Sequence, residues 1–207
     1  GLKMIEGKPT SRRELNVPVT DPYFADYWAC VEERGIPVLW HVNDPEEFWD
    51  PQKTPSWAKE QGWFYDSSYP TKEQLYAEVE GVLDACPNLK VIFAHFYFVS
   101  ADLEMASSFL EGHRNACLDL TPGIEMYYNF SARREEWRDF FIRYQDRILY
   151  GTDIGGGQSV AEATSRAWIV REFLETDDEF LVPEESDSLL GGPEVPFRGL
   201  NLPGAAL

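Results

Sequence analysis

The chain has 207 residues, and its 18 Lys and Arg against 36 Asp and Glu give a net charge of −18 at pH 7. Hydrophobic residues make up 43% of the chain and aromatic residues 14%, which excludes an intrinsically disordered protein because enough apolar surface exists to offset the entropy lost on folding. Such an acidic chain is not expected to bind nucleic acid or an anionic membrane, since phosphate groups require Lys and Arg.

The three cysteines, Cys30, Cys86 and Cys117, are far apart and form no Cys-x-x-Cys pattern. A disulfide framework and a cysteine zinc site are therefore not expected, and a reducing compartment, the cytoplasm, fits this cysteine usage best. The most hydrophobic stretch, residues 91–99, is too short to span a bilayer.

Short apolar runs alternate with amphipathic segments along the chain. The runs are rich in β-branched and aromatic residues and apolar on both faces, which is typical of parallel strands covered on both sides. Strands are predicted at residues 2–5, 36–40, 90–94, 116–120 and 147–152.

Helices are predicted between these strands, because apolar residues recur there at helical spacing. Thr71 and Gln74 form a capping-box pattern that opens one of them, and Pro87 ends it. The predicted helices cover residues 23–34, 71–86, 101–110, 132–144 and 160–174, the last with Thr164, Trp168 and Phe173 on its apolar stripe. Strand–helix alternation predicts an α/β fold with right-handed βα units.

Two stretches interrupt the alternation. Residues 42–70 form a long connection rich in aromatic residues and proline, and a connection of this length is usually functional or an interface. Residues 176–207, rich in Pro, Gly and acidic side chains, are predicted to be an irregular tail packed on a βα portion that covers residues 1–175.

Three predicted strands end next to a side chain that can bind a metal or transfer a proton: His41, His95 and Asp153. Because the carboxyl ends of parallel strands lie on one side of a βα sheet or barrel, these three side chains are expected to converge there. Imidazole and carboxylate suit Zn²⁺ and similar cations. Each residue also has a simpler interpretation, since either histidine could be an ordinary hydrogen-bonded residue and Asp153 could form a turn or cap a helix.

The segments that carry these residues resemble a known family. GIPVLWHVND, CPNLKVIFAHF, RNACLDLTPG and DRILYGTD occur in the order found in the second half of the amidohydrolase superfamily, in the branch called amidohydrolase family 2. The resemblance implies a metal-dependent (β/α)8 TIM barrel of which strands 4 to 8 are recognisable. Members of the family include hydrolases, lactonases and nonoxidative decarboxylases.

The resemblance also implies roles for individual residues. His41 corresponds to the metal ligand on strand 5, and His95 to the strand-6 histidine that binds metal in some members and contacts substrate or transfers protons in others. Asp153 corresponds to the strand-8 aspartate, which binds the metal and takes a proton from the attacking water in hydrolytic members. The implied cofactor is a divalent metal, Zn first and Mn as an alternative. Lys3 falls near strand 4, where some members carry a carboxylated lysine, although an ordinary strand lysine fits this position better.

One motif of the family is missing. The His-x-His or Glu-x-His motif expected at the end of strand 1 is not found, so the fold is expected to be a partial barrel and the chain a piece of a longer enzyme. A full barrel needs about 250 residues. If the chain is instead the whole molecule, two open sheet edges favour a homo-oligomer.

The residues around His41 are candidates for binding a small-molecule substrate. Trp49, Trp57, Trp63 and Tyr65 could form the wall of an apolar site, or could equally pack the long connection on the domain or on a second subunit. Asn43 or Asp44, directly after His41, could support that histidine, and Asn43 is also a candidate substrate contact. The three glycines at 155–157 could bind an anion before a helix, but a turn is the simpler interpretation.

The sequence predicts a metal-dependent hydrolase that cleaves an amide or lactone with a metal-activated water. The alternative is a metal-dependent nonoxidative decarboxylase of an aromatic or unsaturated carboxylic acid. A second alternative is a non-catalytic βα binding module whose strand-end residues only form hydrogen bonds. A nucleotide-binding fold is poorly supported, because neither a P-loop nor a Gly-x-Gly-x-x-Gly pattern occurs.

Overall fold

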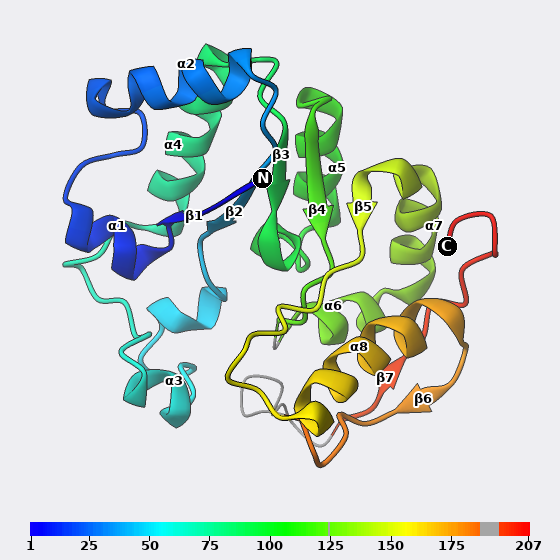
Figure 1. Ribbon diagram of the computed structural model, residues 1–207. Coiled ribbons are helices and arrows are strands. Elements are labelled where there is room, and N and C mark those ends of the chain that lie inside the picture. The colour runs from blue at the N-terminus through cyan, green and yellow to red at the C-terminus, as the bar shows by residue number, and fades with distance from the viewer. Residues whose placement is uncertain (124, 187–194) are drawn as a thin grey trace. The chain divides into compact units, whose positions relative to one another are not determined.

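The computed structural model covers the whole chain, and the structure describes residues 1–123, 125–186 and 195–207. The chain divides into two compact units, which are described separately below. The first unit contains residues 1–98 and 113–116, and the second contains residues 99–112 and 117–207. In Figure 1 the first unit runs from blue to green and the second from green to red.

The first unit is built on three parallel strands, β1 (Leu2–Gly7), β2 (Val38–Val42) and β3 (Val91–Phe93), which pair in that order (Figure 1). The three predicted strands are confirmed. β1 extends two residues beyond its apolar run, because Gly7 still pairs with Val42 of β2.

Helices and 3-10 turns connect these strands. In chain order they are α1 (Pro9–Leu15), η1 (Pro22–Phe24), α2 (Ala25–Glu33), η2 (Glu46–Trp49), α3 (Ser56–Glu60), α4 (Lys72–Ala85) and η3 (Ala94–Phe98). The capping box of Thr71 and Gln74 is present at the start of α4. The Trp28 ring of α2 packs against Trp40 of β2 with ring centroids 5.0 Å apart, which fixes that helix on the sheet.

The second unit contains the parallel pair β4 (Ala116–Asp119) and β5 (Ile148–Leu149). Its helices are α5 (Leu103–Gly112), α6 (Met126–Ala132), α7 (Arg134–Arg143) and α8 (Val160–Glu175), with the 3-10 turn η4 (Gln145–Arg147). The helix predicted over 132–144 begins only at Arg134, because Arg133 has φ −127° and ψ 48°, and α6 precedes it. The stripe predicted on α8 was wrong in part: Trp168 is 38% exposed, whereas Arg166, Ile169, Val170 and Phe173 are buried.

The tail contributes a short antiparallel pair, β6 (Glu179–Phe180) and β7 (Phe197–Arg198), to the second unit. The Arg134 guanidinium of α7 donates to the Gly199 carbonyl at 2.6 Å, and the Leu200 amide donates to the Phe173 carbonyl at 2.6 Å. The part of the tail between residues 187 and 194 lies outside the described residues.

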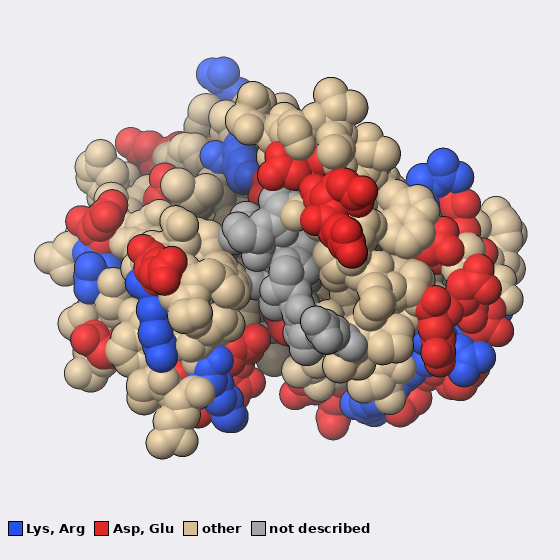
Figure 2. Space-filling model, turned by 90° about the horizontal axis from the view of Figure 1, so that it is seen from below, with Lys and Arg blue, Asp and Glu red and all other residues tan. Residues whose placement is uncertain are grey.

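Parallel strands connected by helices make this an α/β protein of the TIM-barrel type, as expected for part of a (β/α)8 barrel. Within the described residues, no helix is long and apolar enough to cross a membrane. On the face shown in Figure 2, Asp and Glu are spread widely, with Lys and Arg scattered between them.

Candidate functional site

The carboxyl ends of β1, β2 and β3 bring together polar residues in the first unit. Because the strands are parallel, Lys8 after β1, Asp44 after β2 and His95 after β3 lie at the same end of the sheet. Gly7 permits this approach, since a Cβ on that residue would lie 2.8 Å from the His41 carbonyl oxygen and 2.7 Å from Val42 Cγ2. The glycine thus lets β1 run close enough to β2 for Lys8 to reach Asp44.

His41 lies within β2, and its side chain is only 13% exposed. Its Nε2 atom is 3.0 Å from the Asn43 carbonyl oxygen and 3.3 Å from Asp44 Oδ1. Both neighbours accept hydrogen bonds, so Nε2 carries the proton and donates it. In neutral His41 this tautomer leaves the lone pair on Nδ1, which is then the nitrogen that can bind a metal.

Asp44 is a buried carboxylate that links three segments. Its two oxygens each lie 2.8 Å from Lys8 Nζ, and its side chain is 4% exposed. The Tyr65 hydroxyl also donates a hydrogen bond to it. Burial by itself would raise the pKa of Asp44, but the charges of Lys8 and the hydrogen bond with His41 lower that pKa to about 2. Asp44 is therefore ionised at neutral pH and holds His41 in one orientation.

His95 packs beside His41, with the two ring centroids 4.8 Å apart and the planes at 68°. The Phe98 ring lies 5.3 Å from the His95 ring and 5.5 Å from the His41 ring, so both imidazoles have an aromatic neighbour. Burial lowers the pKa of His95 well below its ordinary value, and the neighbouring His41 lowers that pKa further. His95 is therefore a neutral imidazole, the form that binds metals and accepts protons.

The backbone that carries His95 has an unusual conformation. Four consecutive residues are left-handed, with φ of 54° at His95, 54° at Phe96, 58° at Tyr97 and 53° at Phe98. For residues with a Cβ this costs on the order of 1–2 kcal/mol each. Such strain persists only where the surrounding structure enforces it, and it concentrates at functional sites.

Helix α4 supplies contacts that hold this left-handed turn. The Tyr76 hydroxyl lies 3.1 Å from the Tyr97 carbonyl oxygen and 3.3 Å from that of Phe98, and Lys72 Nζ lies 3.2 Å from the Phe98 carbonyl oxygen. The Tyr76 and Tyr97 rings also pack together, with centroids 4.8 Å apart. One helix face therefore fixes the turn that orients His95.

Asn43 is fully buried and has a left-handed φ of 71°. Its Nδ2 donates to the Lys72 carbonyl at 3.2 Å, and its backbone amide donates to the Gly7 carbonyl at 2.9 Å. Within the described residues its Oδ1 has no hydrogen-bond partner. A buried carbonyl oxygen of this kind, two residues from His41, is suited to a ligand that the structure does not contain.

The aromatic residues of the 42–70 connection form a cluster of their own. Phe48, Ala58 and Tyr65 are its buried centre, and Trp49, Trp57, Trp63 and Tyr69 pack around them. Lys8 Nζ lies 4.5 Å from the centroid of the Trp63 ring, and Tyr65 reaches Asp44. The three tryptophans predicted to contact substrate therefore pack against this cluster, next to the Lys8–Asp44 pair.

Asp153 belongs to the second unit. The strand predicted over 147–152 was too long, because β5 ends at Leu149, and Asp153 follows it in an exposed left-handed conformation with φ of 50°. The neighbouring Thr152 carbonyl accepts a hydrogen bond from Nη1 of Arg166, a buried arginine of α8. Gly155, Gly156 and Gly157 have open space where a Cβ would lie and form an exposed turn before Ser159 caps α8.

The donor chemistry of the first unit fits a divalent cation. His41 and His95 offer two adjacent imidazole nitrogens, and Asn43 adds a buried oxygen. Among the described residues, however, no group of three or more His, Cys, Asp or Glu is arranged to hold a metal. Asp153 remains the predicted third ligand.

The expectation that the chain lacks a Glu-x-His pattern was wrong, because Glu111-Gly112-His113 matches it. The pattern lies at the end of helix α5 and not after a strand. His113 pairs with Glu80 at 2.8 Å, and Glu111 accepts hydrogen bonds from Arg143 and Tyr144. It therefore does not replace the strand-1 motif of the resemblance.

The chain matches the family model for amidohydrolases over residues 8–191, which include His41, His95 and Asp153. The chain belongs to the amidohydrolase family.

The solved structures to which this amidohydrolase is similar share little sequence identity with it. An uncharacterized TIM-barrel protein from Bordetella bronchiseptica is 17% identical, with a TM-score of 0.43, 66% of this chain covered and 39% of that one. A 2,6-dihydroxybenzoate decarboxylase from Rhizobium is 15% identical, with a TM-score of 0.41 and coverage of 72% and 50%. A 5-carboxyvanillate decarboxylase from Sphingomonas paucimobilis is 14% identical, with a TM-score of 0.40 and coverage of 73% and 48%.

The chain thus spans half or less of the length of these solved structures. No protein with a curated description matches it.

One residue of the site, Lys8, escaped the sequence analysis, and so did the contact that Tyr65 makes with Asp44. Lys8 follows the true end of β1, but the apolar run ends earlier at Ile5, so the residue was not assigned to a strand end. Tyr65 lies 21 residues beyond Asp44, and no sequence spacing indicates that its hydroxyl reaches the carboxylate. Asp44 itself was a candidate because it follows His41 closely.

Proposed function

We propose that this amidohydrolase is part of a metal-dependent enzyme that hydrolyses a small amide or lactone. The observation that carries the proposal is the adjacent pair of partly buried imidazoles, His41 and His95, with His41 oriented by Asp44. A coordinated divalent cation lowers the pKa of a bound water towards about 7 and so supplies a nucleophile at neutral pH. Zn is the first candidate for this metal and Mn the second.

The residues of the chain have separate tasks in this proposal. His41 binds the metal through Nδ1, since Nε2 is used towards Asn43 and Asp44. His95, held neutral by burial, is a second ligand or accepts a proton at a ring nitrogen. Asp153 would be the third ligand and would accept a proton from water at a carboxylate oxygen. Asn43 accepts a hydrogen bond from substrate at Oδ1, and Trp49, Trp57 and Trp63 form the apolar side of the site.

A second candidate is the nonoxidative decarboxylation of an aromatic carboxylic acid. The aromatic cluster favours it, because Trp63 stands beside Lys8 and Tyr65 binds Asp44, the carboxylate that orients His41. In this case His41, His95 and Asp153 would hold the metal that anchors the acid, and His95 or the metal site would manage the proton that is exchanged for CO₂.

A turnover assay distinguishes the two reactions. The protein is freed of metal, reloaded with Zn or Mn, and incubated with a panel of lactones, amides and aromatic acids, while acid release and CO₂ release are followed in parallel. We expect metal-dependent acid release that Asp153→Asn lowers by about 100-fold or more, because the variant loses the proton acceptor. CO₂ release without hydrolysis would replace the first candidate with the second.

The third histidine of the chain provides the matched control. His113 pairs with Glu80 on the surface of the first unit and takes no part in the proposed site. His113→Ala is therefore expected to keep full turnover while His41→Ala and His95→Ala lose it. Turnover that persists without metal, or that all three histidine variants retain, would contradict the proposal.

A further inference from the structure

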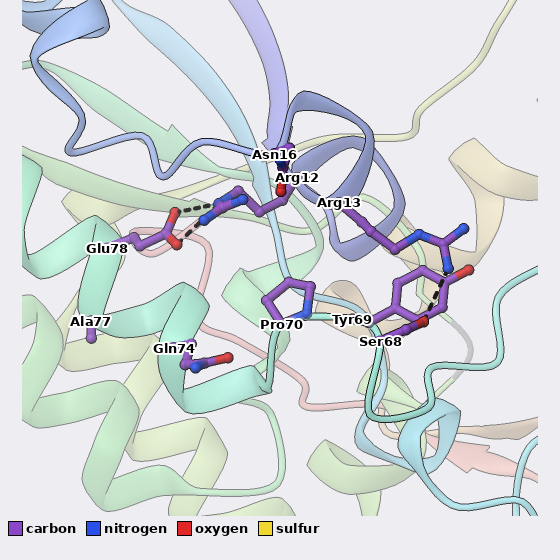
Figure 3. A pocket seen from close by; sticks show the side chains of 9 residues that line it. All are labelled: Arg12, Arg13, Asn16, Ser68, Tyr69, Pro70, Gln74, Ala77 and Glu78. Atoms are coloured by element: carbon purple, nitrogen blue, oxygen red, sulfur yellow. Dashed lines mark hydrogen bonds and ion pairs between the residues drawn. The ribbon is translucent and has the colours of Figure 1, made fainter.

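A separate cavity of about 410 Å³ opens on the first unit, away from the residues assigned above. It is bounded by α1, by α4 and by the loop of residues 68–70, which leads into α4 (Figure 3). Its lining consists of Arg12, Arg13, Asn16, Ser68, Tyr69, Pro70, Gln74, Ala77 and Glu78. The volume is at the small end of the range of cavities that bind small molecules.

The charge of Arg12 is already used within the protein. Its Nε lies 3.0 Å from each carboxylate oxygen of Glu78, and both side chains are about 15% exposed. Glu78 also accepts a hydrogen bond from the Val19 amide. Arg12 and Glu78 therefore form a fixed side of the cavity whose charges cancel.

Arg13 is different, because its guanidinium is oriented but not neutralised. Its Cζ lies 3.8 Å from the centroid of the Tyr69 ring, and Nη1 lies 3.3 Å from the Ser68 hydroxyl oxygen (Figure 3). Within the described residues Arg13 forms no ion pair, and it is exposed. A guanidinium held by stacking and one hydrogen bond keeps other N–H donors for a planar anion.

The lining carries two positive charges and one negative charge, a net charge of +1 in a chain whose net charge is −18. Asp66 lies near enough for Arg13 to help lower its pKa, after the hydrogen bonds that Ser68 gives it. Because Arg12 neutralises Glu78, the Arg13 guanidinium supplies one positive charge that the nearby Asp66 weakens, and a single negative charge matches it better than two. The charge balance favours a monoanion over phosphate.

The remaining lining residues define the rest of the ligand. In the view of Figure 3, Arg13, Asn16 and Gln74 lie around Pro70, so the lining combines polar groups with the apolar proline ring. Ala77 adds apolar surface from α4. We propose that this cavity is a second binding site, which takes a small organic monocarboxylate whose carboxylate pairs with Arg13 and whose apolar body lies against Pro70 and Ala77.

Titration of the full chain with propionate, benzoate and inorganic phosphate tests the proposal, with the arginine Nε–H signals followed by NMR. We expect both carboxylates to shift the Arg13 signal with a dissociation constant on the order of 1 mM, because a partly exposed ion pair contributes little free energy. Phosphate is expected to bind at least several-fold more weakly.

Two variants make the result specific. Arg13→Gln is expected to lose about three- to fivefold in benzoate affinity, whereas Arg171→Gln, which removes an exposed arginine paired with Glu175 in the second unit, keeps it. Unchanged backbone amide spectra establish that both variants are folded. Equal affinity of Arg13→Gln and the unaltered protein, equal affinity for phosphate and benzoate, or no shift of the Arg13 signal would each overturn the proposal. The site is independent of the metal, so these outcomes leave the proposed function untouched.

Discussion

Asp44 is the residue on which the local order of the candidate site depends. It is a buried carboxylate with three partners, Lys8, His41 and Tyr65, from three different segments. Sequence reasoning could select it, because it follows His41 by three residues. Its partners could not be chosen in the same way, since Lys8 and Tyr65 reach it only through the close approach of β1 and the fold of the long connection.

Asp44→Asn removes the charge that balances Lys8. We expect the free energy of unfolding to fall by about 3 kcal/mol, because Lys8 is left without its counter-charge in a largely buried place. Urea unfolding followed by tryptophan fluorescence measures this loss. Asp50→Asn is the control: its pair with Lys53 is 3.7 Å long and solvent-exposed, so about 0.5 kcal/mol or less is expected. Equal effects of the two substitutions would contradict the role given to Asp44.

The low pKa of Asp44 also predicts how stability depends on pH. The pKa is about 2 in the folded protein against an ordinary 3.8, so this group contributes stability that is fully present above about pH 4 and is lost as the pH falls towards 2. The difference corresponds to roughly 2 kcal/mol. Urea unfolding of the metal-free protein between pH 6 and pH 3 should show this decline, and Asp44→Asn should flatten it. A variant with the same pH slope as the unaltered protein would exclude Asp44 as its source.

At the scale of the element, the left-handed turn of residues 95–98 is held by helix α4. Tyr76→Phe keeps the ring contact with Tyr97 but removes the hydroxyl that lies near two carbonyl oxygens of the turn. We expect a loss of about 1–2 kcal/mol of stability and a changed chemical shift of the His95 imidazole nitrogens. Tyr23→Phe, at a ring that is 78% exposed, should change neither quantity. A Tyr76→Phe spectrum in which the His95 signals do not move would show that the helix does not orient His95.

Helix α4 shows where a sequence pattern is sufficient to predict an element and its buried face. The face of α4 made by Leu75, Val79, Val82 and Leu83 is buried as its spacing predicts. The left-handed turn could not be predicted, because Phe96 and Tyr97 have the composition of an ordinary buried strand and only their tertiary contacts impose positive φ. Strand β5 is also shorter than its predicted range, because residues 150–152 do not pair with a neighbouring strand.

At the scale of the whole molecule, the order of strands and helices was sufficient to predict an α/β fold, whereas the family came from the resemblance of the segments around His41, His95 and Asp153. The spatial convergence of His41 and His95 was also predicted, because each lies at the carboxyl end of a strand and the two strands are parallel. The ring centroids are 4.8 Å apart, which agrees with this prediction. The convergence of Asp153 with them remains a prediction, since it belongs to the other unit.

The predicted homo-oligomer is a second property of the whole molecule. A net charge of −18 opposes self-association at low ionic strength, so added salt should favour it by screening that repulsion. Sedimentation equilibrium at low and high salt is expected to give a mass above 23.8 kDa that rises with salt. A mass of one chain under both conditions would contradict the prediction.

Metal content measured by mass spectrometry of the elements tests the central claim most directly. After exhaustive dialysis against metal-free buffer, the protein is expected to retain a divalent metal, Zn or Mn, in an amount proportional to protein. His41→Ala, His95→Ala and Asp153→Ala should each lose that metal, while His113→Ala keeps it. A folded protein that retains no metal, or that retains as much in His41→Ala and Asp153→Ala as in the unaltered chain, would contradict the account.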